Sequence, residues 1–367
     1  MRPGAGDSDM SPRATVKDVA ARAGVSPATV SRVLAGDYPV SAATRARVQR
    51  AVRDLDYVAN AQARALKGAG PGMIAFVMED VTGPSFAYVA KGVEQQATAE
   101  GRLCLICVTD GDPARELTVV EAMREQRAEA VILVGGGFLD EEHRQRMIHF
   151  AHALDKAGSR LVLCGRPPLG DGVPATVVEY DNEGGAYAMT SHLLSQGHRR
   201  IVYLGNVQPN HTTSLDRVKG FTRAHEAFGV PLDPTLIVPG EFSQAFGQAA
   251  TRRLLGLGVD FTAIFAATDM VAAGVLRALR EAGVRVPQDV SVVGYDDIPL
   301  SVNVTPALTT VRIPTEELGR TAVRLALRPT EPQHVVLGTH IVVRESVAPL
   351  VAPGPLGPVA AADQRGR

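Results

Sequence analysis

Residues 73–108 read MIAFVMEDVTGPSFAYVAKGVEQQATAEGRLCLICV, and this stretch decides the fold class. Apolar runs at 73–78 and 102–108 enclose residues 86–100, where apolar side chains recur at helical spacing. Short, almost uninterrupted apolar runs are typical of strands that are buried on both faces of a parallel sheet. The stretch therefore predicts a strand–helix–strand unit of an α/β fold.

The same alternation continues toward the C terminus. Further helices are predicted at residues 113–127, 140–157, 182–196, 216–228, 243–256 and 269–282. These units are too many for one sheet of usual size, so we expect two similar lobes of doubly wound parallel sheet. We expect the chain to cross between lobes near 179–182, near 302–308 and before HIVVRES (340–346). Ligands of such sheets bind beyond the carboxyl ends of the strands, which predicts a cleft between the lobes.

A small module of three short helices is predicted before this body. Apolar spacing marks the segments 15–23, 26–35 and 41–55. Gly24 is a typical helix terminator, and Ser26 has the chemistry of a helix cap. Outside its apolar face the second helix keeps a polar and small stripe, formed by Ala28, Ser31, Arg32 and Ala35. Core packing does not occupy that stripe, so it is available to lie in a groove.

The charge of this 367-residue chain is unevenly distributed. The whole chain has a net charge of −1, but residues 11–67 hold ten Lys and Arg against four Asp, a net charge of +6 that leaves −7 for the remainder. A basic head joined to a mildly acidic body suggests a module that binds a polyanion. On charge alone, a solvated basic face is the alternative.

Composition narrows the class of protein further. Hydrophobic residues at 45% and charged residues at 21% are globular values, and no run of about 18 apolar residues that could span a bilayer is present. The first fourteen residues, MRPGAGDSDMSPRA, lack the apolar core of a signal peptide, so a cytoplasmic location is expected. The three cysteines lie in apolar runs, which favours reduced thiols.

The residues give no pattern for catalysis, a cofactor or a metal. The run GGG at 135–137 lacks the spacing of a nucleotide-binding loop. Cys104 and Cys107 are three apart in a strand and so point to opposite faces. The histidines are scattered without metal-ligand spacing. We therefore expect no enzyme, no cofactor and no metal site.

Several motifs, taken in order, are similar to those of the LacI/GalR-type bacterial transcription regulators. The head matches as ATVKDVAARAGVSPATVSRVLAG (14–36) and VSAATRARVQRAVRDLDYVANAQARALKG (40–68). The body matches as DNEGGAYAMTSHLLSQGHRRIVYLG (181–205), DRVKGF (216–221), AATDMVAAGVLRALREAGVRVPQDVSVVGYDDIP (266–299), PALTTVRIP (306–314) and HIVVRES. The resemblance covers residues 15–347.

The resemblance implies an α/β protein with a helix-turn-helix head, a hinge helix and a two-lobe, periplasmic-binding-protein-like body. The expected segments are a disordered tail (1–14), the DNA-binding domain (15–57), the hinge (58–70), the effector-binding and dimerisation domain (71–347) and a second disordered tail (348–367). We expect the N-lobe at 71–180 and 308–330, and the C-lobe at 181–302 and 331–347. A periplasmic solute-binding protein would share the body, but the basic head and the missing signal peptide disfavour it.

In a helix-turn-helix domain the second helix enters the major groove with its first residues near the base edges. Pro27 and Ala28 take those places here and permit apolar contact alone. Arg32, one turn later, is the expected reader of guanine, with a phosphate contact as its alternative. Ser26, Thr29 and Ser31 resemble phosphate-binding positions, and Ser26 is equally explained as a helix cap.

The resemblance assigns further contacts to the hinge and to the start of the first helix. Leu66 matches a leucine that the family inserts between base pairs of the minor groove, and its alternative is packing against the body. Ala63 would face the partner hinge, and Asn60 and Tyr57 would approach the DNA backbone. Val16 matches a position near the duplex but equally suits the core of the head. The family usually has proline where this chain has Ala59.

The resemblance also implies an effector site between the lobes. The matching positions are Ser85, Phe86, Asp181, His211, Thr213, Arg217, Phe242, Thr268, Asp269 and Asp296. An Arg fork and a carboxylate on opposing walls, Arg217 and Asp296, suit the adjacent hydroxyls of a sugar, and a mutual salt bridge is the alternative. Asp269 suits a ligand contact or a helix cap equally.

The effector class stays open at this point. Thr268 departs from an asparagine that is common in the family, and the chain has no Trp for sugar stacking. His211 suits an acidic or purine-like ligand, and a protein partner is a further possibility. The expected assembly is a cytoplasmic homodimer on an operator, most often a repressor, because the C-terminal tail has no leucine heptads to join two dimers.

Overall fold

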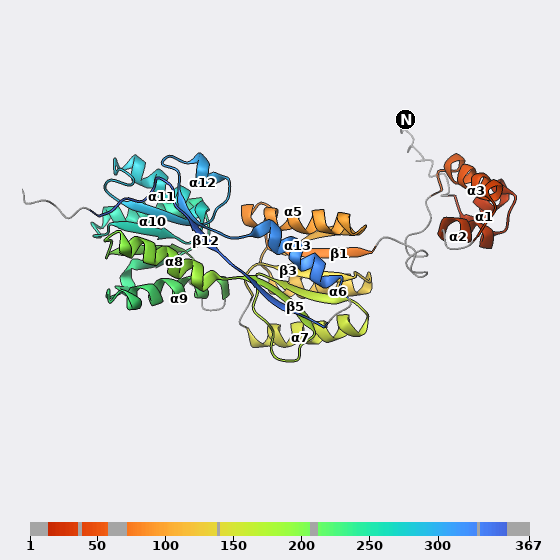
Figure 1. Ribbon diagram of the computed structural model, residues 1–367, viewed down its shortest axis with the longest axis horizontal. Helices are drawn as coiled ribbons and strands as arrows, with labels where there is room; N and C mark the ends of the chain where they lie inside the picture. Colours follow the sequence, from red (N-terminus) through yellow and green to blue (C-terminus); the bar gives the residue numbers. More distant parts are fainter. Residues whose placement is uncertain are drawn as a thin grey trace, which may run out of the picture. The chain divides into compact units, whose positions relative to one another are not determined.

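The computed structural model describes residues 14–35, 39–57, 72–137, 140–205, 212–328 and 331–350. The chain divides into two compact units, 1–71 and 72–367 (Figure 1). No helix within the described ranges is long and apolar enough to cross a membrane.

The first unit consists of α1 (Val16–Ala23), α2 (Pro27–Ala35) and α3 (Ala42–Asp54) around a small core. Thr15 and Asp18 form a capping box at the start of α1, and Gly24 ends that helix in the left-handed conformation that glycine adopts without strain. The fully buried Val19, Val30 and Val48 bring the three helices together. The predicted three-helix head is therefore confirmed.

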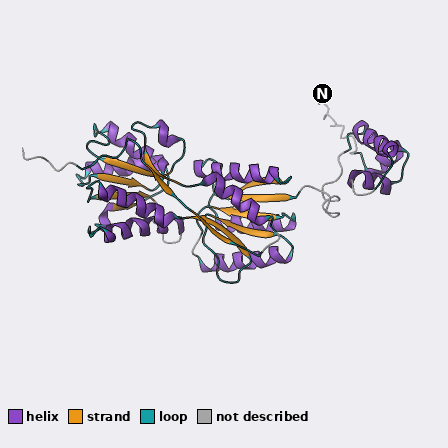
Figure 2. Cartoon of the chain, viewed as in Figure 1, coloured by secondary structure: helices purple, strands orange, loops and turns teal. Residues whose placement is uncertain are grey.

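The second unit contains two parallel-rich sheets, each covered by helices on both faces (Figure 2). In the described ranges the first sheet has the strand order β11-β5-β4-β3-β1-β2. Its strands are β1 (Met73–Met78), β2 (Leu103–Val108), β3 (Ala130–Val134), β4 (Arg160–Cys164), β5 (Ala175–Tyr180) and β11 (His334–Leu337).

Four helices bury the two faces of this first sheet. They are α5 (Pro84–Ala99) and α13 (Thr315–Ala326) on one face, and α6 (Pro113–Glu125) and α7 (Glu141–Lys156) on the other. α5 and α13 approach closely because Gly92 and Gly319 meet there: a Cβ on Gly92 would lie 2.1 Å from the Glu316 carbonyl oxygen. This close approach ties the late helix α13 to the early part of the chain.

The second sheet has the order β12-β10-β9-β8-β6-β7. Its strands are β6 (Ile201–Gly205), β7 (Ile237–Pro239), β8 (Ala263–Ala266), β9 (Ser291–Asp296), β10 (Thr309–Arg312) and β12 (His340–Val342). Its covering helices are α8 (Asn182–Ser195) and α9 (Thr212–Ala227) on one face, and α10 (Gln244–Gly256) and α11 (Asp269–Glu281) on the other. This unit also contains a one-turn 3-10 helix, η1 (Pro234–Leu236), and the short α12 (Leu300–Asn303).

Two expected lobe boundaries need correction. The chain was expected to return to the first lobe near 302–308, but β10 pairs with β9 in the second sheet, with Thr309 opposite Val293. The crossing therefore follows β10, at Ile313 and Pro314. The segment 331–347 was assigned wholly to the C-lobe, yet its first part forms β11, which pairs with β5 in the first sheet. Sheet pairing, which local sequence does not encode, decides both boundaries.

Candidate functional site

The start of α2 presents a polar surface in the first unit. The Ser26 hydroxyl accepts a hydrogen bond from the Thr29 amide at 3.2 Å and also bonds to the Thr29 hydroxyl at 2.9 Å, so Ser26 caps the helix. Pro27, Ala28 and Arg32 are exposed, and Ser31 is half-buried. Ala28, Ser31 and Arg32 of the predicted groove-facing stripe are thus accessible, beside a helix N-terminus that favours phosphate.

Two other predicted DNA contacts lie against the core of the head. Val16 and Tyr57 are partly buried and pack on the cluster around Val19 and Val48. Four arginines on α3 are exposed: Arg45, Arg47, Arg50 and Arg53. The hinge residues Asn60, Ala63 and Leu66, together with His211 of the effector set, lie outside the described residues.

In the second unit, Arg217 is the hub of the predicted effector set. Its side chain is 3% exposed, and it lies on α9 near the carboxyl ends of β8 and β9. Its Nη2 contacts Asp296 Oδ1 at 3.3 Å, its Nε donates to Asn182 Oδ1 at 3.0 Å, and its Nη1 donates to the carbonyl of Ala267. The guanidinium also stacks 3.8 Å above the centre of the Tyr295 ring. The mutual salt bridge, left open by the sequence, is therefore present.

Asp296, at the end of β9, is the partner of Arg217 and is 9% exposed. Its backbone φ is +110°, and that of Asp297 is +56°, conformations that cost a non-glycine residue energy. Burial raises the pKa of Asp296, and the Arg217 guanidinium opposes that rise. Strained backbone at two successive aspartates, at the end of a strand, is typical of a functional site.

Asp296 also connects the two lobes. Ser85 at the start of α5 donates a hydrogen bond from its hydroxyl to Asp296 Oδ2 at 3.0 Å. A second connection joins Gly137 to Thr212: the Gly137 amide donates to Thr212 Oγ1 at 3.0 Å, and the Thr212 amide donates to the Gly137 carbonyl at 3.3 Å. The lobes therefore touch directly where the sequence predicted a ligand.

The other predicted effector residues separate into site walls and structural supports. Thr268 caps α11 by accepting from the Val271 amide, and Asp181 caps α8 by accepting from the Gly184 amide. Asp269 is fully buried and accepts hydrogen bonds from the Thr310 hydroxyl and the Ile298 amide. It therefore links the start of α11 to β10 and to the segment after β9. Burial and the nearby Asp296 raise its pKa well above the usual value.

Phe86, Phe242 and Thr213 are the remaining predicted effector residues that the structure describes. Phe86 is half-buried and packs on Gly83 and Gly135, and the Arg217 guanidinium lies 6.0 Å from the Phe242 ring. Thr213 is buried in the first turn of α9. α9 begins at Thr212, four residues before the predicted start, so Thr212 and Thr213 both belong to the helix.

Sequence reasoning missed four groups that build this site. Tyr180, Asn182 and Tyr295 surround Arg217, and Thr212 joins the lobes. The Tyr295 hydroxyl donates to the Asn182 carbonyl at 3.2 Å, which ties the site to the first crossing between lobes. Asn182 directly follows Asp181 at that crossing, and this position in the sequence could have identified it as a site residue.

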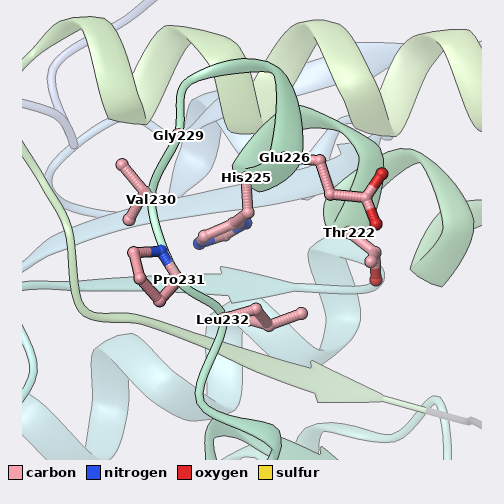
Figure 3. A pocket seen from close by; sticks show the side chains of 7 residues that line it. All are labelled: Thr222, His225, Glu226, Gly229, Val230, Pro231 and Leu232. Atoms are coloured by element: carbon pink, nitrogen blue, oxygen red, sulfur yellow. The ribbon is translucent and has the colours of Figure 1, made fainter.

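Two surface hollows lie apart from this set. The larger, about 380 Å³, lies at the end of α9 and is lined by Thr222, His225, Glu226, Gly229, Val230, Pro231 and Leu232 (Figure 3). The smaller, about 70 Å³, lies beside the start of α7 and includes His143 and Arg166. Neither is lined by a residue of the predicted effector set.

Comparisons with known proteins agree with this arrangement. Residues 15–60 match the model of bacterial regulatory proteins of the lacI family, and residues 190–347 match a periplasmic binding protein-like domain. The HTH-type transcriptional regulator DegA of Bacillus subtilis is 34% identical over 344 residues, which cover 92% of this chain and 99% of DegA.

Two solved structures are similar over nearly the whole chain. A Lac repressor dimer bound to operator and the anti-inducer ONPF has a TM-score of 0.79 at 26% identity, covering 92% of this chain and all of that one. A complex of the regulator CelR with cellobiose has a TM-score of 0.64 at 34% identity, covering 91% of this chain and all of that one.

Proposed function

Because this chain belongs to the LacI family of bacterial transcription regulators, we propose that it is a homodimeric repressor whose grip on a near-palindromic operator is set by a small effector bound between its lobes. The observation that carries this proposal is that α2 exposes Ala28 and Arg32 in the same chain that forms the two-lobe site around Arg217 and Asp296. Because bacterial DNA lies in the cytoplasm, the proposal includes a cytoplasmic location.

On DNA, α2 enters the major groove. Arg32 reads a base edge, and Ser26, Thr29 and Ser31 contact phosphates. Val16 and Tyr57 act from the rim of the head core, where they lie. As the family motif implies, Leu66 inserts into the minor groove, Asn60 approaches the DNA backbone, and Ala63 faces the partner hinge.

Dimer formation is supported by the edge of the first sheet. β2 ends that sheet, and Leu103, Leu105 and Ile106 are 62%, 41% and 46% exposed. An apolar edge strand with unpaired backbone groups favours association with a second copy. The structurally similar Lac repressor binds its operator as a dimer.

The effector is proposed to be a sugar or a sugar derivative. CelR, whose structure is similar over 91% of this chain, is known in complex with cellobiose. Ser85, Phe86, Arg217, Phe242 and Asp296 provide hydroxyl, carboxylate and aromatic surfaces from both lobes, as sugars require. Asp181, Thr213, Thr268 and Asp269 shape the walls behind them, and no catalytic role is assigned to any of these residues.

Selection of random duplexes by the purified full-length chain tests the DNA-binding half of the proposal. The expected result is one enriched, near-palindromic motif whose half-sites are separated by about one helical turn. Replacing Arg32 with Ala should broaden the motif at one position per half-site. If no motif is enriched at low salt, the chain does not bind DNA specifically.

A further inference from the structure

Most of the positive charge of the first unit lies outside the helix that is proposed to enter the major groove. α2 carries one basic residue, Arg32, whereas α3 carries four arginines, all of them exposed. α3 has one acidic residue, Asp54, which pairs with Arg22 of α1 at 3.6 Å. The arginines of α3 therefore form an exposed surface of net positive charge.

Three of these arginines form a row along α3. Arg47, Arg50 and Arg53 follow one another at intervals of three residues, which makes them neighbours on the helix surface. With a rise of about 1.5 Å per residue, this arginine row extends over about 9 Å of the helix axis. Like charges that are neighbours on a helix repel one another, so a negatively charged partner would stabilise the arginine row.

The arginine row faces away from the core of the unit. Val48 and Ala51 are buried in the core cluster and mark the inner side of α3. With about 3.6 residues per turn, Arg50 and Arg53 lie nearly opposite that inner side. Figure 1 shows α2, which carries Arg32, and α3 at opposite sides of the unit. A duplex that takes α2 into its major groove therefore leaves the outer side of α3 open to a second partner.

The chemistry of the arginine row fits the phosphate backbone of DNA. Duplex DNA carries one negative charge per about 1.7 Å of its axis, so a row of about 9 Å meets several phosphates. Guanidinium groups bind phosphate oxygens through paired N–H donors, and such contacts depend on no particular base. A linear polyanion can therefore satisfy the whole row at once.

Resting on the proposed function, we propose that the arginine row binds a second DNA duplex while α2 occupies the operator. The contact is made to phosphates by Arg50 and Arg53, with Arg47 at one end of the row, and it reads no sequence. A dimer on its operator presents two such rows, one on each head, and so bridges the operator to another segment of DNA. Because the contact consists of ion pairs with phosphates, it weakens steeply as the salt concentration rises.

The test measures the capture of a second duplex by the full-length chain on its operator. The selected operator is immobilised and loaded with protein, and a fluorescent duplex of equal length without the operator motif is added at low salt. Wild type should retain this second duplex. Arg50→Gln/Arg53→Gln should reduce its retention by about fivefold or more, because two phosphate contacts are lost, and should leave operator affinity unchanged. Arg253→Gln/Arg280→Gln is the matched control, since these exposed arginines lie on α10 and α11 of the second unit.

A second variant separates charge from structure. Arg50→Lys/Arg53→Lys keeps both charges and should retain most of the captured duplex. A loss of capture as large as that of the glutamine variant would overturn an electrostatic contact.

The proposal is overturned if wild type captures no second duplex, or if the glutamine variant captures as much as wild type. It is also overturned if the glutamine variant binds the operator more weakly with a salt slope reduced by about two, since the row would then contact the operator itself. Failure of the proposed function appears earlier, as the absence of an enriched operator, so the two failures are distinguishable.

Discussion

At the scale of single residues, the Arg217–Asp296 pair holds together several segments of the second lobe at the proposed effector site. The guanidinium bonds to Asn182, Ala267 and Asp296, which belong to different segments of the second lobe. Removing it leaves a buried, unpaired carboxylate and several unsatisfied acceptors.

Arg217→Ala should therefore destabilise the protein by about 3–5 kcal/mol, the range measured when one partner of a buried ion pair is removed. Urea unfolding followed by circular dichroism measures the effect. Arg223→Ala is the control, because the Arg223–Glu183 pair is exposed and should change stability by under about 1 kcal/mol. Equal losses in the two variants would contradict the central role of Arg217.

Arg32 and Ser26, both proposed to contact DNA, should differ in how they affect binding. Arg32→Ala should cost about 1–3 kcal/mol at one base position and relax the preference there. Ser26→Ala should weaken binding to all sequences alike, and it also removes the cap of α2. Fluorescence anisotropy on the selected operator and on single-base variants separates the two patterns. A uniform loss in Arg32→Ala would assign Arg32 to a phosphate.

At the scale of elements, the packing of α5 on α13 depends on the absence of side chains. A Cβ on Gly92 would meet the Glu316 carbonyl at 2.1 Å, and one on Gly319 would meet the Val89 carbonyl at 2.3 Å. Both obstacles are backbone atoms, which cannot swing away. The two helices would have to separate.

Gly92→Ala should thus lower the free energy of unfolding by about 1–3 kcal/mol, as overpacking does elsewhere. Gly256→Ala offers a matched control at the end of α10, where a Cβ would meet nothing within 4 Å. That variant should be neutral or stabilising by up to about 1 kcal/mol. Thermal denaturation of both variants in the same buffer gives the comparison.

A buried charge cluster links α6, α7 and the segment after β4. Glu116 is 3% exposed and bonds to Arg166 and His143. Burial alone would raise the pKa of Glu116, but these partners more than offset it and hold that pKa at about 2. Because the folded-state pKa lies below the ordinary 4.5, the stabilisation is complete above about pH 4.5 and is lost as the pH falls toward 2.

The wild type should therefore lose about 3 kcal/mol more stability between pH 5 and pH 2 than Glu116→Gln, whose side chain does not titrate. Glu116→Gln itself should be less stable at pH 7, since Arg166 loses its charge partner. Glu142→Gln, on the exposed pair with Arg146, serves as the control. Parallel pH profiles for wild type and Glu116→Gln would refute the linkage.

At the scale of the whole molecule, dimer formation and DNA binding should be coupled. Leu105 is exposed on the edge strand β2, so a charge there would bring like charges together at the proposed dimer edge. Leu105→Lys should shift the protein toward monomer and lower operator affinity at least tenfold, while leaving the fold intact because the position is exposed. Sedimentation velocity and operator titration measure the two effects. Monomers that bind the operator as tightly as wild type would separate the two properties.

Much of this protein was determined by its sequence alone. The polar stripe of α2 and the strand–helix alternation predicted the head and the two lobes, because cap residues and hydrophobic periodicity are local properties. The effector set came from the resemblance of the body motifs to a known family. Arg217 and Asp296 were found because they belong to continuous motifs.

Tertiary structure alone decided how those parts meet. β10 was expected in the first lobe but belongs to the second sheet, and β11 was expected in the second lobe but belongs to the first sheet. Strand pairing decides this because it joins residues that are far apart in the chain. The Ser85–Asp296 and Gly137–Thr212 bonds span 211 and 75 residues. No local pattern encodes contacts across such sequence separations. They arise because the carboxyl ends of parallel strands from the two sheets converge, and this brings residues that were predicted separately close together.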